Sequence, residues 1–282
     1  MVEIRTAKTA GFCFGVRQAV DKAFALAETE KELYTYGPVI HNDEVIRRLE
    51  EKGARIIHDE EGLRALTSGT VLLRSHGVSR SVIELLEEKG LPYVDVTCPF
   101  VKRIHEIVRK ESGEKQIVIC GNASHPEVEG IMGWCRTPAV VLSEEEEALN
   151  FVPPEGRSVC VVAQTTFNHK KFEKILELFR KKSYDVSIVN TICNATVAHQ
   201  TEAKEIASGV DAMIVIGDTK SSNTRKLFEI CRQECDRTVF IQTVTDLEPM
   251  QDGSIHTVGI TAGASTPNYI IEEVQKYVRR EF

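Results

Sequence analysis

Three cysteines divide the chain almost into thirds, and each stands in a similar setting. Cys13, Cys98 and Cys193 are 85 and 95 residues apart in a chain of 282 residues. Each lies close to the start of a segment with helical periodicity, and the last two also follow an apolar, strand-like run. This spacing predicts three similar α/β units that converge on one point. Three thiolates without a fourth ligand are suited to an iron–sulfur cluster with one open iron.

Composition excludes several classes of protein. The chain is 42% hydrophobic and 27% charged, as soluble globular proteins are, and its net charge of −7 does not indicate a nucleic-acid partner. No apolar run approaches the roughly 20 residues of a membrane span. The N-terminus lacks the apolar core of a signal peptide. We therefore expect a cytoplasmic protein with neither a membrane nor a nucleic acid as partner.

Strand-like and helical patterns alternate along the chain. Helices are expected over 16–29, before Gly90, after Cys98, after Ser143 with Glu146 at the capping-box position, and around 172–179. Strands are expected at 71–73, 93–96, 117–120, 159–162, 186–192, 213–216, 239–241 and 258–260. This order predicts an α/β fold with parallel sheets. Cuts near the cysteines give three units, at 14–97, at 98–192, and at 193–282 completed by 1–13.

Polar loops follow the apolar strands, where ligands of parallel α/β sheets bind. They are rich in hydroxyls, amides and imidazoles, and they comprise 37–42, 74–77, 121–127, 163–166, 217–223 and 261–267. Any one of them alone is best read as a helix cap or a structural loop. Their position at the same end of the strands favours a site for a small anion, with phosphate or diphosphate as the natural ligand. Neither GxxxxGK[ST] nor GxGxxG is present, so the usual nucleotide sites are not supported.

The cysteine pattern favours a cluster over other uses of thiols. Eight cysteines in a reducing compartment argue for metal or redox use of some of them, and no CxxC pair supports a zinc ribbon. A thiol at a helix N-terminus has a lowered pKa, and the resulting thiolate is a soft ligand for iron–sulfur clusters or zinc. Cys120 and Cys160 are predicted to be core residues. Glu127, two residues after His125, could move protons near an open iron.

Seven motifs, in order, resemble those of one enzyme family. They are Gly11-Phe12-Cys13-Phe14-Gly15-Val16, Ser75-His76-Gly77, Asp95-Val96-Thr97-Cys98-Pro99, His125-Pro126-Glu127-Val128, Gln164-Thr165-Thr166, Ser221-Ser222-Asn223 and Thr261-Ala262-Gly263-Ala264-Ser265. Over essentially the whole length, the chain resembles the 4-hydroxy-3-methylbut-2-enyl diphosphate reductases. These enzymes catalyse the last step of the methylerythritol phosphate (non-mevalonate) route to isoprenoids.

The resemblance implies a fold, a cofactor and a set of roles. The fold would be a trefoil of three pseudo-threefold-related α/β units around a central [4Fe–4S] cluster, one per chain, held by Cys13, Cys98 and Cys193. The open iron would act as Lewis acid and electron relay during a dehydroxylation that uses two electrons and two protons. Ferredoxin or flavodoxin would donate the electrons. Catalysis would fall to Glu127, His125 and Thr165, with Glu127 as proton donor. The allylic diphosphate would be bound by His41, His76, His125, Thr165, Ser221, Ser222, Asn223 and Ser265.

Other functions remain open at this point. Quinolinate synthase, another three-cysteine cluster enzyme, and hydro-lyases of the aconitase type would use an open iron without net reduction. A cluster-based iron or redox sensor is a non-enzymatic alternative, although the chain offers no basic recognition helix. A zinc-stabilised structural protein is a further one, and metal analysis would separate it.

Overall fold

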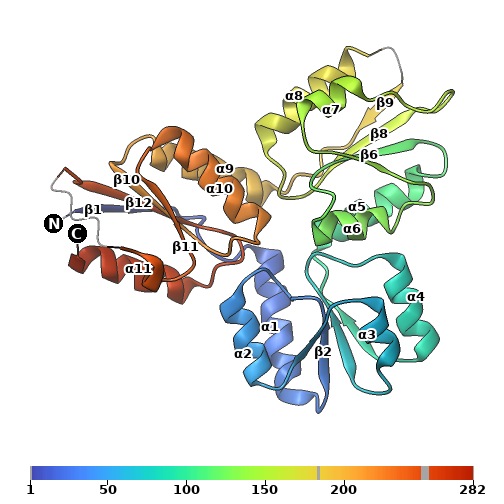
Figure 1. Ribbon diagram of the computed structural model, residues 1–282, viewed down its shortest axis with the longest axis horizontal. Helices are drawn as coiled ribbons and strands as arrows, with labels where there is room; N and C mark the ends of the chain where they lie inside the picture. Colours follow the sequence, from blue (N-terminus) through green and yellow to red (C-terminus); the bar gives the residue numbers. More distant parts are fainter. Residues whose placement is uncertain (1, 183–184, 249–253, 282) are drawn as a thin grey trace. The chain divides into compact units, whose positions relative to one another are not determined.

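A computed structural model describes residues 2–182, 185–248 and 254–281 of the chain (Figure 1). The described residues form three four-stranded sheets, and all of the strand pairs in them are parallel. By its internal contacts the chain divides into two compact units. The first unit comprises 1–17, 41–44 and 194–282, and the second comprises 18–40 and 45–193. The predicted α/β class with parallel sheets is confirmed.

The first unit is built on a sheet with the strand order β1-β12-β10-β11. Its strands are β1 (Glu3–Thr6), β10 (Ala212–Ile216), β11 (Thr238–Ile241) and β12 (Thr257–Ala262). The central strand β10 is apolar throughout because helices cover both faces of the sheet. Ile214 and Ile216 pack with α11 (Asn268–Glu281) on one face, whereas Met213 and Val215 pack with α9 (Asn194–Ala207) and α10 (Ser222–Glu234) on the other. Full burial of such a side chain stabilises the fold by about 1.5–3 kcal/mol.

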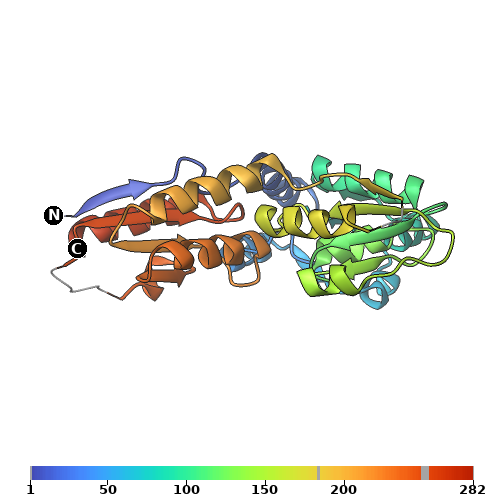
Figure 2. The same ribbon diagram turned by 90° about the horizontal axis from the view of Figure 1, so that it is seen from above.

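The helices of this unit carry small or apolar residues on the side that faces the sheet (Figure 1). They are α9 (Asn194–Ala207), α10 (Ser222–Glu234) and α11 (Asn268–Glu281), with a short 3₁₀ helix, η1 (Val244–Asp246). Helices α9 and α10 lie side by side (Figure 2). Helix α10 begins at a true cap, because the Ser221 hydroxyl accepts a hydrogen bond from the Thr224 N–H at 3.3 Å.

The second unit contains two sheets. The first of them has the order β3-β2-β4-β5, with β2 (Leu33–Tyr36), β3 (Arg55–Ile57), β4 (Thr70–Leu73) and β5 (Tyr93–Asp95). Helices α3 (Glu60–Ala65) and α4 (Arg80–Lys89) pack on one face through Leu63, Val82 and Leu86. Helices α1 (Phe14–Thr29) and α2 (Asp43–Glu51) lie on the other face (Figure 1).

The other sheet of the second unit has the order β7-β6-β8-β9. Its strands are β6 (Gln116–Cys120), β7 (Val140–Leu142), β8 (Val159–Ala163) and β9 (Val186–Ile188). Helices α5 (Pro99–Glu111) and α6 (Pro126–Met132) cover one face, with Ile104 and Ile131 against Ile119. Helices α7 (Glu145–Asn150) and α8 (His169–Arg180) lie on the opposite face (Figure 1).

Most of the predicted elements are present, with two differences. The strand expected over 186–192 ends at Ile188, and an extended loop continues to Cys193. The cap predicted for α7 is wrong by one residue. Glu144, rather than Ser143, is the N-cap, and the Glu147 carboxylate, rather than that of Glu146, accepts from the Ser143 and Glu144 N–H groups at 2.5 and 2.9 Å. Because four glutamates follow Ser143, a cap at Ser143 or at Glu144 would place a glutamate at the capping-box position. The cap at Glu144 gives the Glu147 carboxylate two backbone donors.

The strands of the second unit end where the candidate site residues begin. β4 ends at Leu73 before Arg74-Ser75-His76-Gly77, β6 ends at Cys120 before the 121–127 loop, and β8 ends at Ala163 before Gln164-Thr165. The predicted boundaries of three units stay a prediction. Among the described residues, no helix is both long and apolar enough to cross a membrane.

Candidate active site

His125 forms the N-cap of helix α6, and this fixes the chemistry of its ring. The Nδ1 atom accepts a hydrogen bond from the Glu127 N–H at 3.1 Å. A nitrogen that accepts cannot carry the proton of a neutral imidazole, so the hydrogen bond assigns that proton to Nε2. The Nε2–H is therefore the hydrogen-bond donor of this ring at the start of α6.

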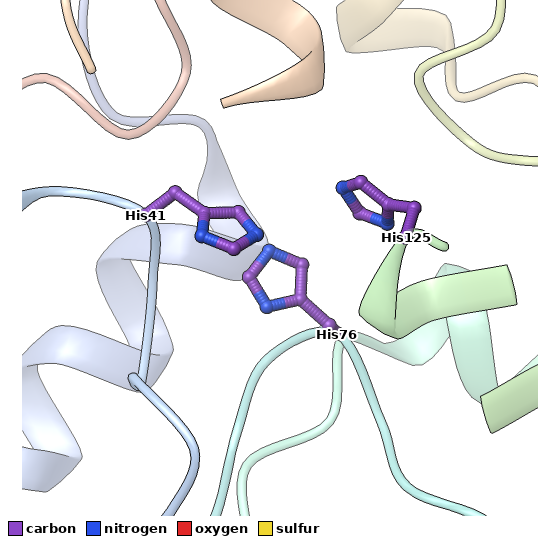
Figure 3. Close-up of side chains that lie close together, drawn as sticks. All are labelled: His41, His76 and His125. Carbon is purple, nitrogen blue, oxygen red and sulfur yellow. The ribbon is translucent and has the colours of Figure 1, made fainter. Parts of the chain in front are cut away.

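His76 lies beside His125 in the same unit. The two ring centroids are 5.5 Å apart with an interplanar angle of 80°, an edge-to-face arrangement, and a nitrogen of each ring lies within 4.8 Å of the other (Figure 3). His76 sits in the turn after β4, in which the Gly77 N–H donates to the Arg74 carbonyl at 3.0 Å. His41 follows directly on Ile40 and belongs to the stretch 41–44 that groups with the first unit. The structure thus places two imidazoles together at the ends of two strands.

Glu127 is a buried carboxyl group, with only 2% of its surface exposed. It accepts two hydrogen bonds from Thr165, from the N–H to Oε1 at 2.6 Å and from the hydroxyl to Oε2 at 2.8 Å. Burial raises the pKa of Glu127 to about 7, and the two hydrogen bonds from Thr165 oppose this rise. A carboxyl with such a pKa can both hold and release a proton at neutral pH, which is what a general acid requires.

Replacing Thr165 with valine is expected to raise the pKa of Glu127 further. The hydroxyl bond to Oε2 favours the charged carboxylate, and valine removes it while the backbone N–H bond to Oε1 remains. Difference infrared spectroscopy of the protonated carboxyl band, followed through a pH titration, measures the shift. The matched control is Thr166→Val, whose hydroxyl accepts from Gln164 at 3.0 Å. Equal titration midpoints in both variants and the parent protein would contradict this account.

Two of the three predicted ligand cysteines lie in the second unit and share backbone contacts with the polar residues. The Cys98 N–H donates to the Ser75 carbonyl at 3.0 Å, beside His76. The Cys193 N–H donates to the Thr165 carbonyl at 3.0 Å. Both side chains are half-buried, directly before α5 and α9 respectively. A backbone hydrogen bond therefore holds Cys98 next to the segment that carries His76, and another holds Cys193 next to Thr165.

The third predicted ligand and the hydroxyl-rich loops belong to the first unit. Cys13 is half-buried directly before α1, and its N–H donates to the Ala264 carbonyl at 3.4 Å, next to Ser265. Ser221, Ser222 and Asn223 form the N-terminus of α10, where the helix dipole favours an anion. Cys13 and Ser265 are thus held together by the backbone at one end of the β12 strand.

Several polar atoms of the first unit are buried without a hydrogen-bond partner among the residues that the structure describes. They include both amide atoms of Asn223 and the hydroxyl of Ser265, with Asp218 Oδ2 and the hydroxyls of Thr224 and Thr261. An unpaired buried polar group costs about 1–3 kcal/mol, so native proteins rarely retain several close in sequence without a reason. A ligand that accepts hydrogen bonds would satisfy the donors. These atoms support the predicted anion site at Asn223 and Ser265.

Asn223→Leu is expected to stabilise the ligand-free protein and to weaken anion binding. Leucine has nearly the same shape and removes the two unpaired atoms of the amide, a gain of about 1–2 kcal/mol in the free energy of unfolding. Loss of the Nδ2 donor should weaken the binding of inorganic diphosphate about tenfold. Thermal unfolding and calorimetric titration measure the two effects.

Gln116→Leu is the matched control for Asn223→Leu. Gln116 is also buried, but its Nε2 donates to the carbonyls of Ile117 and Pro138, both at 3.0 Å. Its replacement should lower stability and leave diphosphate binding unchanged. A loss of stability in Asn223→Leu equal to that in Gln116→Leu would show that the Asn223 amide is structural.

The remaining cysteines fit the core rather than a metal site. Burial raises the pKa of Cys120, Cys135 and Cys231 to about 12, so these groups stay thiols at neutral pH. Cys231 Sγ is also within 3.8 Å of the Ala203 carbonyl. None of the eight cysteines, all of which the structure describes, is in a disulfide. The prediction that Cys120 and Cys160 are core residues is confirmed, since both are fully buried.

Sequence reasoning missed some polar residues of this region. Asp218, Thr224 and Thr261 are buried with unpaired oxygens among the described residues, but the sequence analysis gave them no role. Asp218 stands in the polar loop after β10, Thr224 directly follows that loop in helix α10, and Thr261 is the penultimate residue of strand β12, so all three lie in or beside the polar segments noted in the sequence. Burial distinguishes them from the exposed polar residues of the same segments, and burial of loop residues is not readable from a sequence.

Fold and side chains together define an α/β enzyme. It places a protonatable carboxyl, imidazole donors and thiols just after the ends of parallel strands. Comparison with protein families narrows this class: the model described as LytB protein matches residues 4–279. The chain belongs to the LytB family.

Curated relatives at about two-fifths identity carry one name, 4-hydroxy-3-methylbut-2-enyl diphosphate reductase. The relative from Caldanaerobacter subterraneus subsp. tengcongensis is 43% identical over 281 residues, which cover 99% of this chain and 97% of the relative. That from Geobacter metallireducens is 41% identical over 280 residues, with the same coverage. That from Clostridium perfringens strain SM101 is 44% identical over 273 residues, covering 95% of each chain. The predicted resemblance and the prediction of an oxidoreductase are confirmed.

Solved structures give the same result. The structure described as "E-1-hydroxy-2-methyl-but-2-enyl-4-diphosphate reductase from Plasmodium falciparum" matches with a TM-score of 0.90 and 27% identity, over 99% of this chain and 87% of that chain. A structure described as "(E)-4-Hydroxy-3-methyl-but-2-enyl Diphosphate Reductase, the Terminal Enzyme of the Non-Mevalonate Pathway" matches with a TM-score of 0.68 and 38% identity. It covers 99% of this chain and 100% of that one. These likenesses confirm the predicted fold class.

Proposed function

We propose that the protein reductively dehydroxylates 4-hydroxy-3-methylbut-2-enyl diphosphate to isopentenyl and dimethylallyl diphosphate, the last step of the methylerythritol phosphate pathway. The bond from carbon to the terminal hydroxyl breaks, and the oxygen leaves as water with one proton. The allylic skeleton takes up two electrons and the second proton. Membership of the LytB family and the names of the relatives support this reaction. The observation that carries it is Glu127: burial raises the pKa of its carboxyl to about 7, and its backbone N–H donates to His125 Nδ1.

The substrate's diphosphate would be bound by hydrogen-bond donors from the polar segments that follow the strands. These donors would be His41, His76, His125, Ser221, Ser222, Asn223 and Ser265. Hydrogen bonds to charged oxygens contribute about 1.5–3 kcal/mol each, so this set can hold a diphosphate without a cluster of lysines. The unpaired Asn223 and Ser265 atoms support this assignment.

Glu127 would deliver the proton. In the protonated form it is a donor buried away from bulk water, and Thr165 fixes both of its oxygens at 2.6 and 2.8 Å. Thr165 would also orient the substrate hydroxyl toward Glu127. A folded-back diphosphate would exclude water from the reacting carbon and so prevent loss of the proton to solvent.

The thiols of Cys13, Cys98 and Cys193 fit a [4Fe–4S] cluster. All three are half-buried at positions directly before helices, whereas burial keeps the thiols of Cys120 and Cys231 protonated. When bound, such a cluster supplies one-electron transfer and an iron with an open coordination position. A one-electron carrier, ferredoxin or flavodoxin, would bring the electrons.

Anaerobic reconstitution with iron and sulfide, followed by the addition of substrate and a reduced viologen dye, tests the proposal. We expect dye oxidation that depends on the substrate, with both five-carbon diphosphates formed. A cluster-loaded protein that leaves the substrate unchanged would contradict the proposal. It would favour quinolinate synthase or hydro-lyase chemistry instead. Zinc in place of iron in the purified protein would favour the structural alternative.

A further inference from the structure

Arg74 is a half-buried cation that the proposed mechanism does not use. It stands directly after strand β4 and two residues before His76. Its guanidinium lies over the ring of the buried Tyr36, with 5.9 Å from Cζ to the ring centroid, and its Nε donates to the Gly77 carbonyl at 3.2 Å. Arg74 therefore closes the turn that carries His76 by two hydrogen bonds with Gly77, one through its carbonyl and one through its side chain.

The same guanidinium fixes the loop that follows β2. Gly37 has a φ of +69°, which favours glycine, and a Cβ added there would lie 2.6 Å from Arg74 Nη1 and would displace the guanidinium. Two residues later the Val39 carbonyl accepts from the Ser75 hydroxyl at 2.8 Å and from the Ser75 N–H at 3.1 Å. Arg74 and Ser75 together attach the turn to the loop that leads to His41.

The outer side of the turn is held by neutral groups. Gly77 has a φ of +77°, and a Cβ there would lie 2.6 Å from His105 Cε1. His105 stacks on Trp134 at 5.3 Å with an angle of 17°, and the Trp134 indole N–H donates to the Val78 carbonyl at 2.9 Å. Burial lowers the pKa of His105 to about 4, so its ring is uncharged at neutral pH. The His105 and Trp134 contacts to the turn are thus made by uncharged groups, whereas Arg74 is a cation.

We propose that Arg74 is a positioning residue that holds the 74–77 turn, and with it the His76 imidazole, in the orientation that binds the substrate's diphosphate. The assignment rests on the proposed function, since it takes His76 as a diphosphate ligand. Arginine is suited to this task because its planar fork can donate to a carbonyl and stack on an aromatic ring at once. Burial lowers the pKa of Arg74, while Glu129 and Tyr36 raise it, so the group remains a cation.

Two substitutions separate positioning from packing. Arg74→Met keeps most of the side chain's volume but removes the Nε donor and the charge, and Arg74→Ala leaves a space that free guanidinium ion can enter. The matched control is Arg80→Met, an exposed arginine six residues further on that pairs with Glu84 at 2.7 Å. Each protein is reconstituted and assayed for iron content, thermal unfolding, kcat, KM, and the dissociation constant of inorganic diphosphate.

For Arg74→Met we expect KM and the diphosphate dissociation constant to rise about tenfold, because an imidazole donor to a charged oxygen is displaced. Iron content should match that of the wild-type protein, and kcat should stay within a factor of a few. Guanidinium ion, far below denaturing concentrations, should restore diphosphate binding in Arg74→Ala and have no effect on Arg80→Met.

Two results would overturn the role of Arg74. One is equal diphosphate affinity in Arg74→Met and Arg80→Met. The other is a parallel loss of iron, stability, kcat and binding that guanidinium does not relieve, because that pattern belongs to a packing residue. A wild-type protein that binds diphosphate but leaves the substrate unchanged contradicts the proposed reaction instead. In that case the diphosphate titrations still decide the role of Arg74.

Discussion

Glu127→Gln should lower turnover by a factor of about 10²–10⁴, the contribution typical of a positioned general acid, while the cluster and substrate binding persist. The amide has the same shape as the carboxyl. Its oxygen can accept from the Thr165 N–H, and its NH₂ can donate to the Thr165 hydroxyl, so both contacts at 2.6 and 2.8 Å survive. Steady-state kinetics with reduced viologen, together with iron analysis and a substrate dissociation constant, measure the three quantities separately.

The pH dependence provides a second test of the same group. Because the proton donor must be protonated, wild-type turnover should fall as pH rises through about 7, the value to which burial raises the pKa of Glu127. Stability should follow the same direction. The folded state holds the proton more tightly than the unfolded chain, where the pKa is near 4.5, so the folded protein loses stability between about pH 4.5 and 7.

Glu127→Gln carries no charge at this position and should lack that pH-dependent loss. The variant should therefore gain stability relative to the wild type as pH rises from 5 to 8, by an amount on the order of 3 kcal/mol. Denaturant unfolding at the two pH values measures the difference. Near-normal turnover in the variant, or a stability difference that does not change with pH, would remove Glu127 from the role of proton donor.

Cys98→Ser should abolish turnover and lower the iron content of the reconstituted protein. A serine hydroxyl is a poor ligand for iron in a cluster compared with a thiolate. The backbone around residue 98 should be unchanged, because the N–H of that residue still donates to the Ser75 carbonyl at 3.0 Å. Iron and acid-labile sulfide analysis, the visible absorption of the cluster and the viologen assay give three independent readings.

Cys135→Ser is the matched control for Cys98→Ser. Its side chain is also half-buried, and its Sγ lies 3.6 Å from the Ile131 carbonyl, a contact that a serine hydroxyl can reproduce. Full iron content and normal turnover are expected there. If Cys98→Ser retained the iron content of Cys135→Ser, Cys98 would not be a ligand, and the proposed three-cysteine set would fail.

In the described sheets, the sequence predicts five of the six central strands but only three of the six edge strands, β5, β9 and β11. β4, β6, β8 and β10 are continuous apolar runs because helices cover both faces, and all four were predicted. β1, β3 and β7 were not predicted, and each lies at a sheet edge with three or four residues. β1 contains Glu3 and Arg5 and β3 begins with Arg55, so neither is an apolar run, whereas β7 is apolar but has only three residues. β2 was missed although it is central, because Tyr34, Thr35 and Tyr36 do not form an apolar run.

For the candidate site, the sequence indicates which residues take part but not their protonation or their contacts. The residue types and their place after strands point to His76, His125, Glu127 and Thr165 as candidates. The raised pKa of Glu127 depends on complete burial, and the proton on His125 Nε2 depends on one hydrogen bond from a backbone N–H. Both are properties of three-dimensional packing, which no pattern of residue types encodes. Arg74 begins one of the polar loops noted in the sequence, but only the contacts with Tyr36, Gly37 and Gly77 give it a role.

The cap of helix α6 gives different chemical roles to His125 and Glu127, which are two residues apart. A second proton on the His125 ring would have to go to Nδ1, where it would face the Glu127 N–H at 3.1 Å and remove the side-chain cap of the helix. The hydrogen bond therefore occupies Nδ1 as an acceptor and leaves the Nε2–H as the donor of the neutral ring. The carboxyl two residues later, on the same turn, can change its charge without disturbing the cap. Binding and proton supply are thus kept on separate groups by a single backbone hydrogen bond.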